Sequence, residues 1–247
     1  SEGFEGFELY FQPIYNTDND SLSGAEALIR WNSKKYGFTG PNTFIPLLED
    51  SALIIPLGRW IINTAAKACN RWITSIPDFV MHINLSFVQI VKSNIVKDVL
   101  ENIERYSAAN NHYVFEITET IEMDQIPAVQ NVFKEFVKNE FRFAIDDFGT
   151  GYSNYGYMRD RTFDIVKVDR SFVTDIDKLK DNYLMVSFII KMAHEMGLHV
   201  CIEGVETKEE LSCVKKLGAD YIQGYYYGKP VCLQDFEEQH LKRFVLG

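Results

Sequence analysis

The fold is decided by residues 8–31, ELYFQPIYNTDNDSLSGAEALIRW, which contain two apolar stretches joined by a very short link. We expect strands over 8–14 and 24–31. The link at 15–21, YNTDNDS, is rich in residues that favour turns and is too short for a helical crossover. The two strands are therefore predicted to form an antiparallel hairpin.

Beyond the hairpin, short apolar runs alternate with longer helical patterns, which favours parallel strands joined by helices. We expect further strands over 80–84, 112–117, 141–147, 163–169, 198–203 and 219–223. We expect helices over 41–50, 57–76, 93–109, 124–139, 183–196, 207–216 and 233–243. Thr207 and Glu210 fit a capping box, and Gly197 and Gly218 stand where helices give way to strands.

Eight strands with intervening helices in 247 residues have the size of a (β/α)8 barrel. The predicted fold class is therefore α/β, a modified (β/α)8 TIM-like barrel with one antiparallel strand. An open doubly wound sheet is the alternative, but no GxGxxG motif follows the first strand. No linker-like stretch divides the chain, so we expect a single domain over 1–247, cut from a longer protein.

The composition excludes several classes of protein. The 25 Lys and Arg against 35 Asp and Glu give a net charge of −10, which argues against a nucleic-acid polymer as partner. No apolar run approaches the ~18 residues of a membrane helix, so we expect no membrane contact by this domain. The 4 cysteines and 5 histidines show no metal-ligand spacing, and we expect core or surface roles for them. The N-terminus lacks a signal-peptide pattern, so we expect a cytoplasmic location, although a full-length protein could carry a membrane anchor.

Oxygen-bearing side chains stand at or near the ends of most predicted strands. They are Glu26, Asn84, Glu116, Glu119, Asp146, Asp147, Asp169, Glu203 and Gln223, and Lys167 lies inside one strand. A single acid at a strand end is ordinarily a solvated cap, and a single lysine in a strand is ordinarily on the surface. In a barrel, however, the carboxyl ends of parallel strands meet at one mouth, where carboxylates would repel one another unless cations lay between them. Oxygen ligands of this kind suit Mg²⁺ or Mn²⁺.

The adjacent acids Asp146 and Asp147 need a special geometry to act together. Neighbouring residues of a strand point to opposite faces of the sheet. We expect the chain to leave the sheet at this point, so that both carboxylates turn toward a pair of metals.

Several long motifs occur together over nearly the whole chain. They are Glu26-Ala27-Leu28, FQPI at 11–14, FIPLLED at 44–50, LGRW at 57–60, INLS at 83–86, EITE at 116–119, DDFGTGYS at 146–153, VKVDRSFV at 166–173, IEGVET at 202–207 and QGYYYGKP at 223–230. In order and spacing the chain resembles the EAL domain, a family of cyclic di-GMP phosphodiesterases. The resemblance implies the barrel with one antiparallel strand. It also implies hydrolysis of cyclic di-GMP to linear pGpG in bacterial second-messenger signalling, with two Mg²⁺ or Mn²⁺ ions per active site.

The resemblance also implies roles for residues at matching positions. The ligands of one metal would be Glu26, Asn84, Glu116 and Asp146, and those of the other would be Asp146, Asp147 and Glu203. Lys167 would position or activate the attacking water, and Gln223 would support that water and the metal shell.

Three further matches concern the substrate, and a fourth concerns a loop. Arg30 would contact a substrate phosphate, with Gln12 and Asp169 also at the substrate. Glu119 would hold the loop that follows the two aspartates.

Two other functions compete with an active phosphodiesterase. The first is a catalytically silent sensor that binds cyclic di-GMP, although such relatives typically lack metal ligands or the lysine, all of which are present here. The second is a competent domain kept silent by a missing partner, because family members are often joined to sensor or cyclase domains. A homodimer through the loop after Asp147 is also implied. Tyr152, Tyr155 and Tyr157 could line that contact or pack on their own barrel.

Overall fold

Eight strands close into a barrel in the computed structural model, which describes residues 4–118, 127–150 and 162–242. They are β1 (Phe7–Asn16), β2 (Leu22–Ser33), β4 (Val80–Asn84), β5 (Tyr113–Thr118), β6 (Arg142–Phe148), β7 (Ile165–Val168), β8 (His199–Glu203) and β9 (Tyr221–Gln223). Neighbouring strands in this order pair with each other, and β9 pairs with β1 to close the ring. The pairings are parallel except those of β1, which is antiparallel to both of its neighbours in the ring. The predicted barrel with one antiparallel strand is confirmed.

The hairpin of β1 and β2 is the feature that reverses one strand. Its register places Gln12 of β1 opposite Glu26 of β2. At the turn, the amide of Asn16 donates to the carbonyl of Ser21 at 2.9 Å, and the side-chain oxygen of Asn16 accepts from the amide of Asp18 at 2.9 Å. Side chains that bond to their own backbone in this way stabilise tight turns, which is why so short a link suffices.

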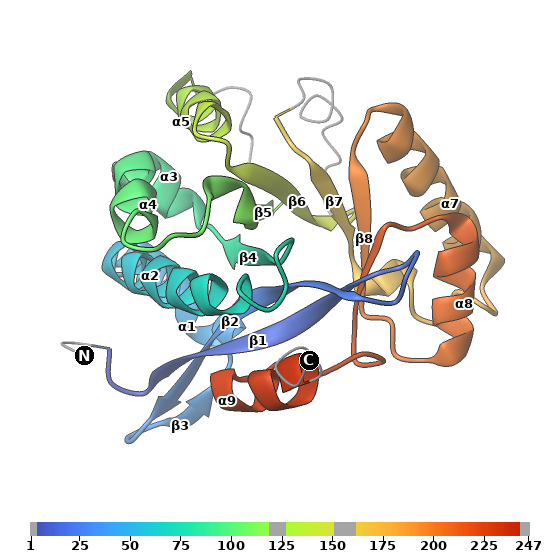
Figure 1. Ribbon diagram of the computed structural model, residues 1–247, viewed down its shortest axis with the longest axis horizontal. Helices are drawn as coiled ribbons and strands as arrows, with labels where there is room; N and C mark the ends of the chain where they lie inside the picture. The colour runs from blue at the N-terminus through green and yellow to red at the C-terminus, as the bar shows by residue number, and fades with distance from the viewer. Residues whose placement is uncertain (1–3, 119–126, 151–161, 243–247) are drawn as a thin grey trace.

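Helices lie outside the ring of strands, with α2 to α4 on one side and α7 and α8 on the other (Figure 1). Their bounds are α1 (Pro41–Asp50), α2 (Ile54–Trp72), α3 (Phe87–Lys92), α4 (Ile95–Ile103), α5 (Pro127–Lys138), α7 (Lys180–Glu195), α8 (Lys208–Leu217) and α9 (Leu233–Phe236). Two short strands, β3 (Gly37–Thr39) and β10 (Val231–Cys232), extend the sheet beyond the ring. Across the described ranges, no helix has the length and apolarity needed to cross a membrane.

The helix expected over 93–109 is wrong in its extent, because α4 covers only Ile95–Ile103, and α3 lies before the expected range and was not predicted. Ser86 and Gln89 make a capping box at the start of α3. Asn94 then caps α4, accepting from the amide of Lys97. A new cap at Asn94 forces the chain out of helical geometry there, since a cap residue has non-helical dihedral angles. By contrast, the predicted capping box of Thr207 with Glu210 at the start of α8 is confirmed.

The interior of the barrel is apolar only at its amino-terminal end. A small apolar cluster there is separate from the main core between strands and helices, and it consists of Ile14, Val114, Ala144, Ile165 and Cys201. Farther along the strands the buried side chains are polar or charged, namely Gln12, Glu26, His82, Glu116, Lys167 and Gln223. Burying such groups costs free energy unless each is paired. The carboxyl-terminal half of the barrel interior therefore contains the groups that are capable of chemistry.

Candidate active site

Lys167 of β7 lies at the centre of the polar interior. Its side chain has no exposed surface, and its Nζ lies 2.8 Å from Oε2 of Glu116 and 2.8 Å from Oε1 of Glu203. The same nitrogen lies 3.3 Å from Oε2 of Glu26 and 3.3 Å from Oδ1 of Asp146. The four acids belong to four other strands, so the barrel brings together residues far apart in the sequence around one ammonium group.

The two-residue period of the strands explains why these groups meet. Side chains two positions apart in a strand share a face. Each of four site residues therefore stands one layer above a member of the apolar interior cluster: Glu116 above Val114, Asp146 above Ala144, Lys167 above Ile165 and Glu203 above Cys201. The strand register then places Asn84 beside Glu116 and Glu203 beside Gln223.

Asp146 and Asp147 are presented by an irregularity inside β6. The register between β6 and β7 shifts between Ile145 and Phe148, and Asp147 has a φ angle of +54°. Aspartate tolerates this left-handed conformation better than most residues, and a bulge of this kind redirects side chains at a strand end. The expectation that the chain leaves the sheet here is wrong, because β6 continues to Phe148. The bulge nevertheless brings ligand atoms of Asp146, Asp147 and Glu203 within 4.8 Å of one another.

Three side-chain amides organise the carboxylate of Glu26. Nε2 of Gln223 donates to Oε2 of Glu26 at 2.6 Å and to Oε1 of Gln12 at 3.1 Å. Nδ2 of Asn84 donates to Oε1 of Glu26 at 2.6 Å. Gln12 in turn donates to the carbonyl of Gly228 at 3.4 Å. The position of Glu26 is therefore fixed by hydrogen bonds to both of its oxygens.

The buried charges change one another's pKa values in opposite directions. Burial alone would lower the pKa of Lys167, but the charges of Asp146, Glu116 and Glu203 raise it well above its ordinary value. Burial raises the pKa of Glu116 and of Glu203, and neighbouring carboxylates add to the effect. For Glu26 burial acts in the same direction, yet the charge of Lys167 and the hydrogen bonds from Gln223 and Asn84 outweigh it and lower the pKa. Lys167 therefore stays protonated, while the acids compete for insufficient positive charge.

This donor set fits divalent cations. One ammonium group faces the carboxylates of Glu26, Glu116, Asp146 and Glu203, and Asp147 adds a further acid whose pKa is raised by burial and by the charge of Asp146. Oδ1 of Asp146 is buried and, apart from its ion pair with Lys167, has no hydrogen-bond partner among the described residues. Carboxylate and amide oxygens are the ligands that Mg²⁺ and Mn²⁺ prefer.

A cleft of about 570 Å³ opens beside this cluster. The cleft is lined by four residues of the cluster region, Glu26, Asn84, Asp146 and Asp147. Its other lining residues include Arg30, Pro41, Asn42, Ile45, Pro46, Glu49 and Phe87. Arg30 lies half-buried with its guanidinium carbon 5.7 Å from the centre of the Tyr10 ring. Burial lowers the pKa of Arg30, although guanidinium groups stay charged at any ordinary pH. The cleft thus combines the acid cluster with a cation at its wall.

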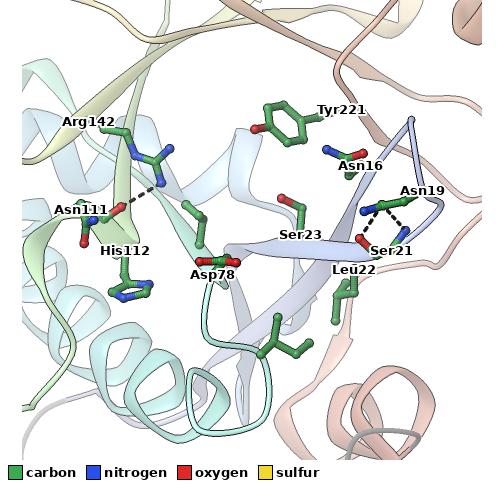
Figure 2. A pocket seen from close by; sticks show the side chains of 12 residues that line it. Asn16, Asn19, Ser21, Leu22, Ser23, Asp78, Asn111, His112, Arg142 and Tyr221 are labelled. Carbon is green, nitrogen blue, oxygen red and sulfur yellow. Dashed lines mark hydrogen bonds between the residues drawn. The ribbon is translucent and has the colours of Figure 1, made fainter.

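A second hollow of about 590 Å³ lies at the opposite end of the barrel, where the strands begin. Asn16, Ser23, Asp78, His112, Arg142 and Tyr221 are among the residues that line it (Figure 2). None of the site residues predicted from the sequence lies there. Among the described residues that line this hollow, there is no cluster of carboxylates comparable to that around Lys167. The cleft at the carboxyl ends is therefore the candidate active site.

One residue at the site was missed by the sequence reasoning. His82 is buried, and its Nδ1 lies 2.7 Å from Oε1 of Glu116. Burial lowers the pKa of His82 to about 3, and the charge of Lys167 adds to the effect. The available signal was its position two residues before Asn84 in the same strand, which places both side chains on the inner face.

Asp169 lies directly after β7. Oδ1 of Asp169 accepts from the amide of Ser171 at 2.9 Å and caps a short 3₁₀ turn, and its charge helps to raise the pKa of Asp147. Glu119 lies outside the described residues. So do Tyr152, Tyr155 and Tyr157 of the loop to which the dimer contact was assigned.

The model of the EAL domain matches residues 4–230. The chain belongs to the EAL domain family. The match covers both strands of the hairpin and every residue of the Lys167 cluster.

Relatives of this EAL domain carry informative names. The chain is 31% identical to cyclic di-GMP phosphodiesterase PdeL of Escherichia coli, covering 91% of this chain and 62% of that protein. It is 30% identical to cyclic di-GMP phosphodiesterase PA2567 of Pseudomonas aeruginosa, covering 95% of this chain and 40% of that protein. A solved structure of the EAL enzyme Bd1971 with cAMP and cyclic di-GMP bound superposes with a TM-score of 0.89, at 36% identity over 95% of this chain and 64% of that chain. The chain spans only 27% to 35% of the length of several other relatives.

Proposed function

We propose that this EAL domain is a phosphodiesterase that hydrolyses one phosphodiester bond of cyclic di-GMP and releases linear pGpG. The names of its relatives support the substrate class. The observation that carries the proposal is Lys167 with four carboxylates around its ammonium group. A domain that only binds the dinucleotide has no need for so costly a buried cluster.

We propose that two divalent cations, Mg²⁺ or Mn²⁺, bind at this cluster. Glu26, Asn84, Glu116 and Asp146 would hold one of them, and Asp146, Asp147 and Glu203 would hold the other. When bound, a pair of such cations activates water as a nucleophile and stabilises charge on the attacking and leaving oxygens. The positive charge of these cations would make the acid cluster compatible with a dianionic substrate, even though the chain has a net charge of −10.

Lys167 would position or activate the attacking water. Its Nζ lies between 2.8 and 3.3 Å from four carboxylates, so it stands where the proposed cations and their water would bind. An ammonium group in this position orients the water and offsets negative charge that develops on the reacting phosphate. Gln223 would assist, since its Nε2 bonds to Glu26 while its buried Oε1 has no hydrogen-bond partner among the described residues.

Substrate contacts would come from the walls of the cleft. Arg30 would bind a phosphate oxygen, because a half-buried guanidinium group is suited to paired hydrogen bonds with phosphate. Gln12 would support the substrate site through its hydrogen bond with Gln223. Asp169 would contribute to substrate binding from the turn that follows β7. Glu119 keeps its proposed role of holding the loop after Asp147.

The direct test is to incubate the purified chain with cyclic di-GMP and Mn²⁺ and to follow the products by chromatography. We expect linear pGpG from the wild-type chain and none from Glu203→Gln, which removes a charged group 2.8 Å from Lys167. Binding of cyclic di-GMP without cleavage would support the sensor function instead. Failure of both binding and cleavage would refute the assignment to this substrate.

A further inference from the structure

His82 and Lys167 each make a short contact to the carboxylate of Glu116. The histidine lies in β4 with its side chain on the inner face of the barrel, one layer below Asn84. Its Nδ1 lies 2.7 Å from Oε1 of Glu116, while Nζ of Lys167 lies 2.8 Å from Oε2 of the same carboxylate. Both oxygens of Glu116 are thus held, each by a different residue.

The two contacts have different consequences for the carboxylate. Lys167 also contacts the acids of three other strands, so its bond to Glu116 is shared with those groups. The contact from His82 belongs to Glu116 alone, because no other hydrogen bond of His82 is found among the described residues. His82 and Lys167 together therefore restrict the rotation of the Glu116 carboxylate about its last bond.

The surroundings of His82 favour a ring proton on Nδ1 that points toward Glu116. On its other side the histidine lines a small cavity of about 10 Å³ together with Ser23, Arg142, Ile165 and Tyr221. That cavity wall contains no carboxylate, so Glu116 is the strong acceptor within reach of the ring. A short bond between an imidazole and a carboxylate fixes both the tautomer of the ring and the orientation of the acid.

We propose that His82 is a positioning residue that donates from Nδ1 to Glu116 and orients this carboxylate for the metal site. The inference rests on the proposed function only in taking Glu116 as a metal ligand. Residues that hold a ligand in place commonly change metal affinity about 10–100-fold when they are lost.

The test uses three variants of the whole chain. His82→Leu keeps the approximate volume but removes the donor, whereas His82→Asn places an amide nitrogen near the position of Nδ1. Met81→Ala is the matched control, because Met81 is an equally buried neighbour in β4 whose side chain packs in the main core instead. Mn²⁺ binding is measured by calorimetry, and folding is checked by circular dichroism and thermal unfolding.

We expect His82→Leu to bind Mn²⁺ about 10–100-fold more weakly, with His82→Asn recovering most of the loss and Met81→Ala close to the wild type. Unchanged Mn²⁺ affinity in a folded His82→Leu variant would overturn the inference and leave the proposed function standing. Absence of Mn²⁺ binding by the wild type would instead refute the proposed metal site. If His82→Leu does not fold, the ring ¹⁵N shifts of the Mg²⁺-treated wild type decide: a proton on Nδ1 supports the inference, and a proton on Nε2 alone contradicts it.

Discussion

Nζ of Lys167 and Oε2 of Glu116 lie 2.8 Å apart, and neither side chain has any exposed surface. Removing one partner of such a pair leaves the other charge buried and uncompensated. This commonly destabilises a protein more than replacing both partners with apolar residues of similar volume. The same ammonium group is assigned to the attacking water. Changes at Lys167 should therefore affect both the stability and the chemistry of the domain, and the two effects can be separated.

We predict that Lys167→Met lowers turnover of cyclic di-GMP about 10²–10⁴-fold, because an interaction made in the transition state is lost. The Michaelis constant should change much less. Without metal the variant should also melt at a lower temperature than the wild type, and Mn²⁺ should recover part of that difference. Steady-state kinetics and thermal unfolding measure these effects, with Lys191→Met, an exposed lysine of α7, as the control. Turnover near the wild-type rate would show that Lys167 does not act on the water.

Glu119 should differ from the metal ligands in what its loss does. We predict that Glu119→Ala lowers activity about 10–100-fold, as expected for a residue that supports the site from outside the ligand set. Its Mn²⁺ affinity should stay well above that of Asp146→Ala, which loses the acid shared by both proposed metal positions. Calorimetric titration of both variants tests this, with hydrogen exchange on the loop after Asp147. Equal loss of metal binding in both, with unchanged exchange, would make Glu119 a ligand.

Gly224 is predicted to be costly to replace for a steric reason. A Cβ atom at this position would lie 2.1 Å from the carbonyl oxygen and 2.4 Å from the amide nitrogen of Val205. These are backbone atoms, so relief requires moving the chain beside Gln223. We predict that Gly224→Ala lowers the free energy of unfolding by about 1–3 kcal/mol and also lowers activity.

The control for this steric prediction is Gly40→Ala. A Cβ atom at Gly40 would have no atom within 4 Å, and its φ angle of −71° suits any residue. As the N-cap of α1, this glycine should cost at most about 1 kcal/mol when replaced by alanine. Urea denaturation of the two variants gives the comparison, and equal stability of both would remove the steric argument.

Asp220 should make stability depend on pH. Its carboxylate accepts from the amide of Val200 at 2.7 Å and from Nε2 of His194 at 2.8 Å, and Nδ1 of His199 lies 3.4 Å away. Burial opposes ionisation of Asp220, yet the hydrogen bonds from His199 and His194 lower its pKa to about 2. The hydrogen bond with Asp220 raises the pKa of His199.

The signs of these two shifts define a window of pH. The lowered pKa of Asp220 contributes stability above its unfolded value of about 3.9, and this is lost as the pH falls toward about 2. The raised pKa of His199 contributes stability below its unfolded value of about 6.5, and this is lost as the pH rises through the folded value. We predict that Asp220→Asn costs about 1–2 kcal/mol near pH 5.5 and less at pH 8. Urea denaturation at both pH values measures this, and an equal loss at the two would contradict the charge argument.

Much of the fold could be predicted because its strongest signals are local. The link at 15–21 is too short to cross the barrel, so it dictates the antiparallel strand that β1 provides. Acids at strand ends and the parallel direction of the strands together predict that Glu26, Glu116, Asp146 and Glu203 meet. The contacts of these four residues with Lys167 confirm that they lie together, although their chemical roles stay predictions.

Other features depend on contacts that no local pattern reveals. The bulge that presents Asp147 is a register shift between two strands, and register is fixed only when both strands are in place. The contact of His82 with Glu116 joins neighbouring strands at different heights, so neither residue alone indicates it.

Metal-dependent cleavage at the Lys167 cluster can be tested in one series by chelation and return of metal. Hydrolysis of cyclic di-GMP is followed after excess chelator, and then after Mn²⁺, Mg²⁺ or Ca²⁺ is added back. We predict no pGpG with chelator, restored turnover with Mn²⁺ or Mg²⁺, and poor turnover with Ca²⁺, which is larger and tolerates looser coordination. Undiminished production of pGpG in excess chelator would contradict the central claim.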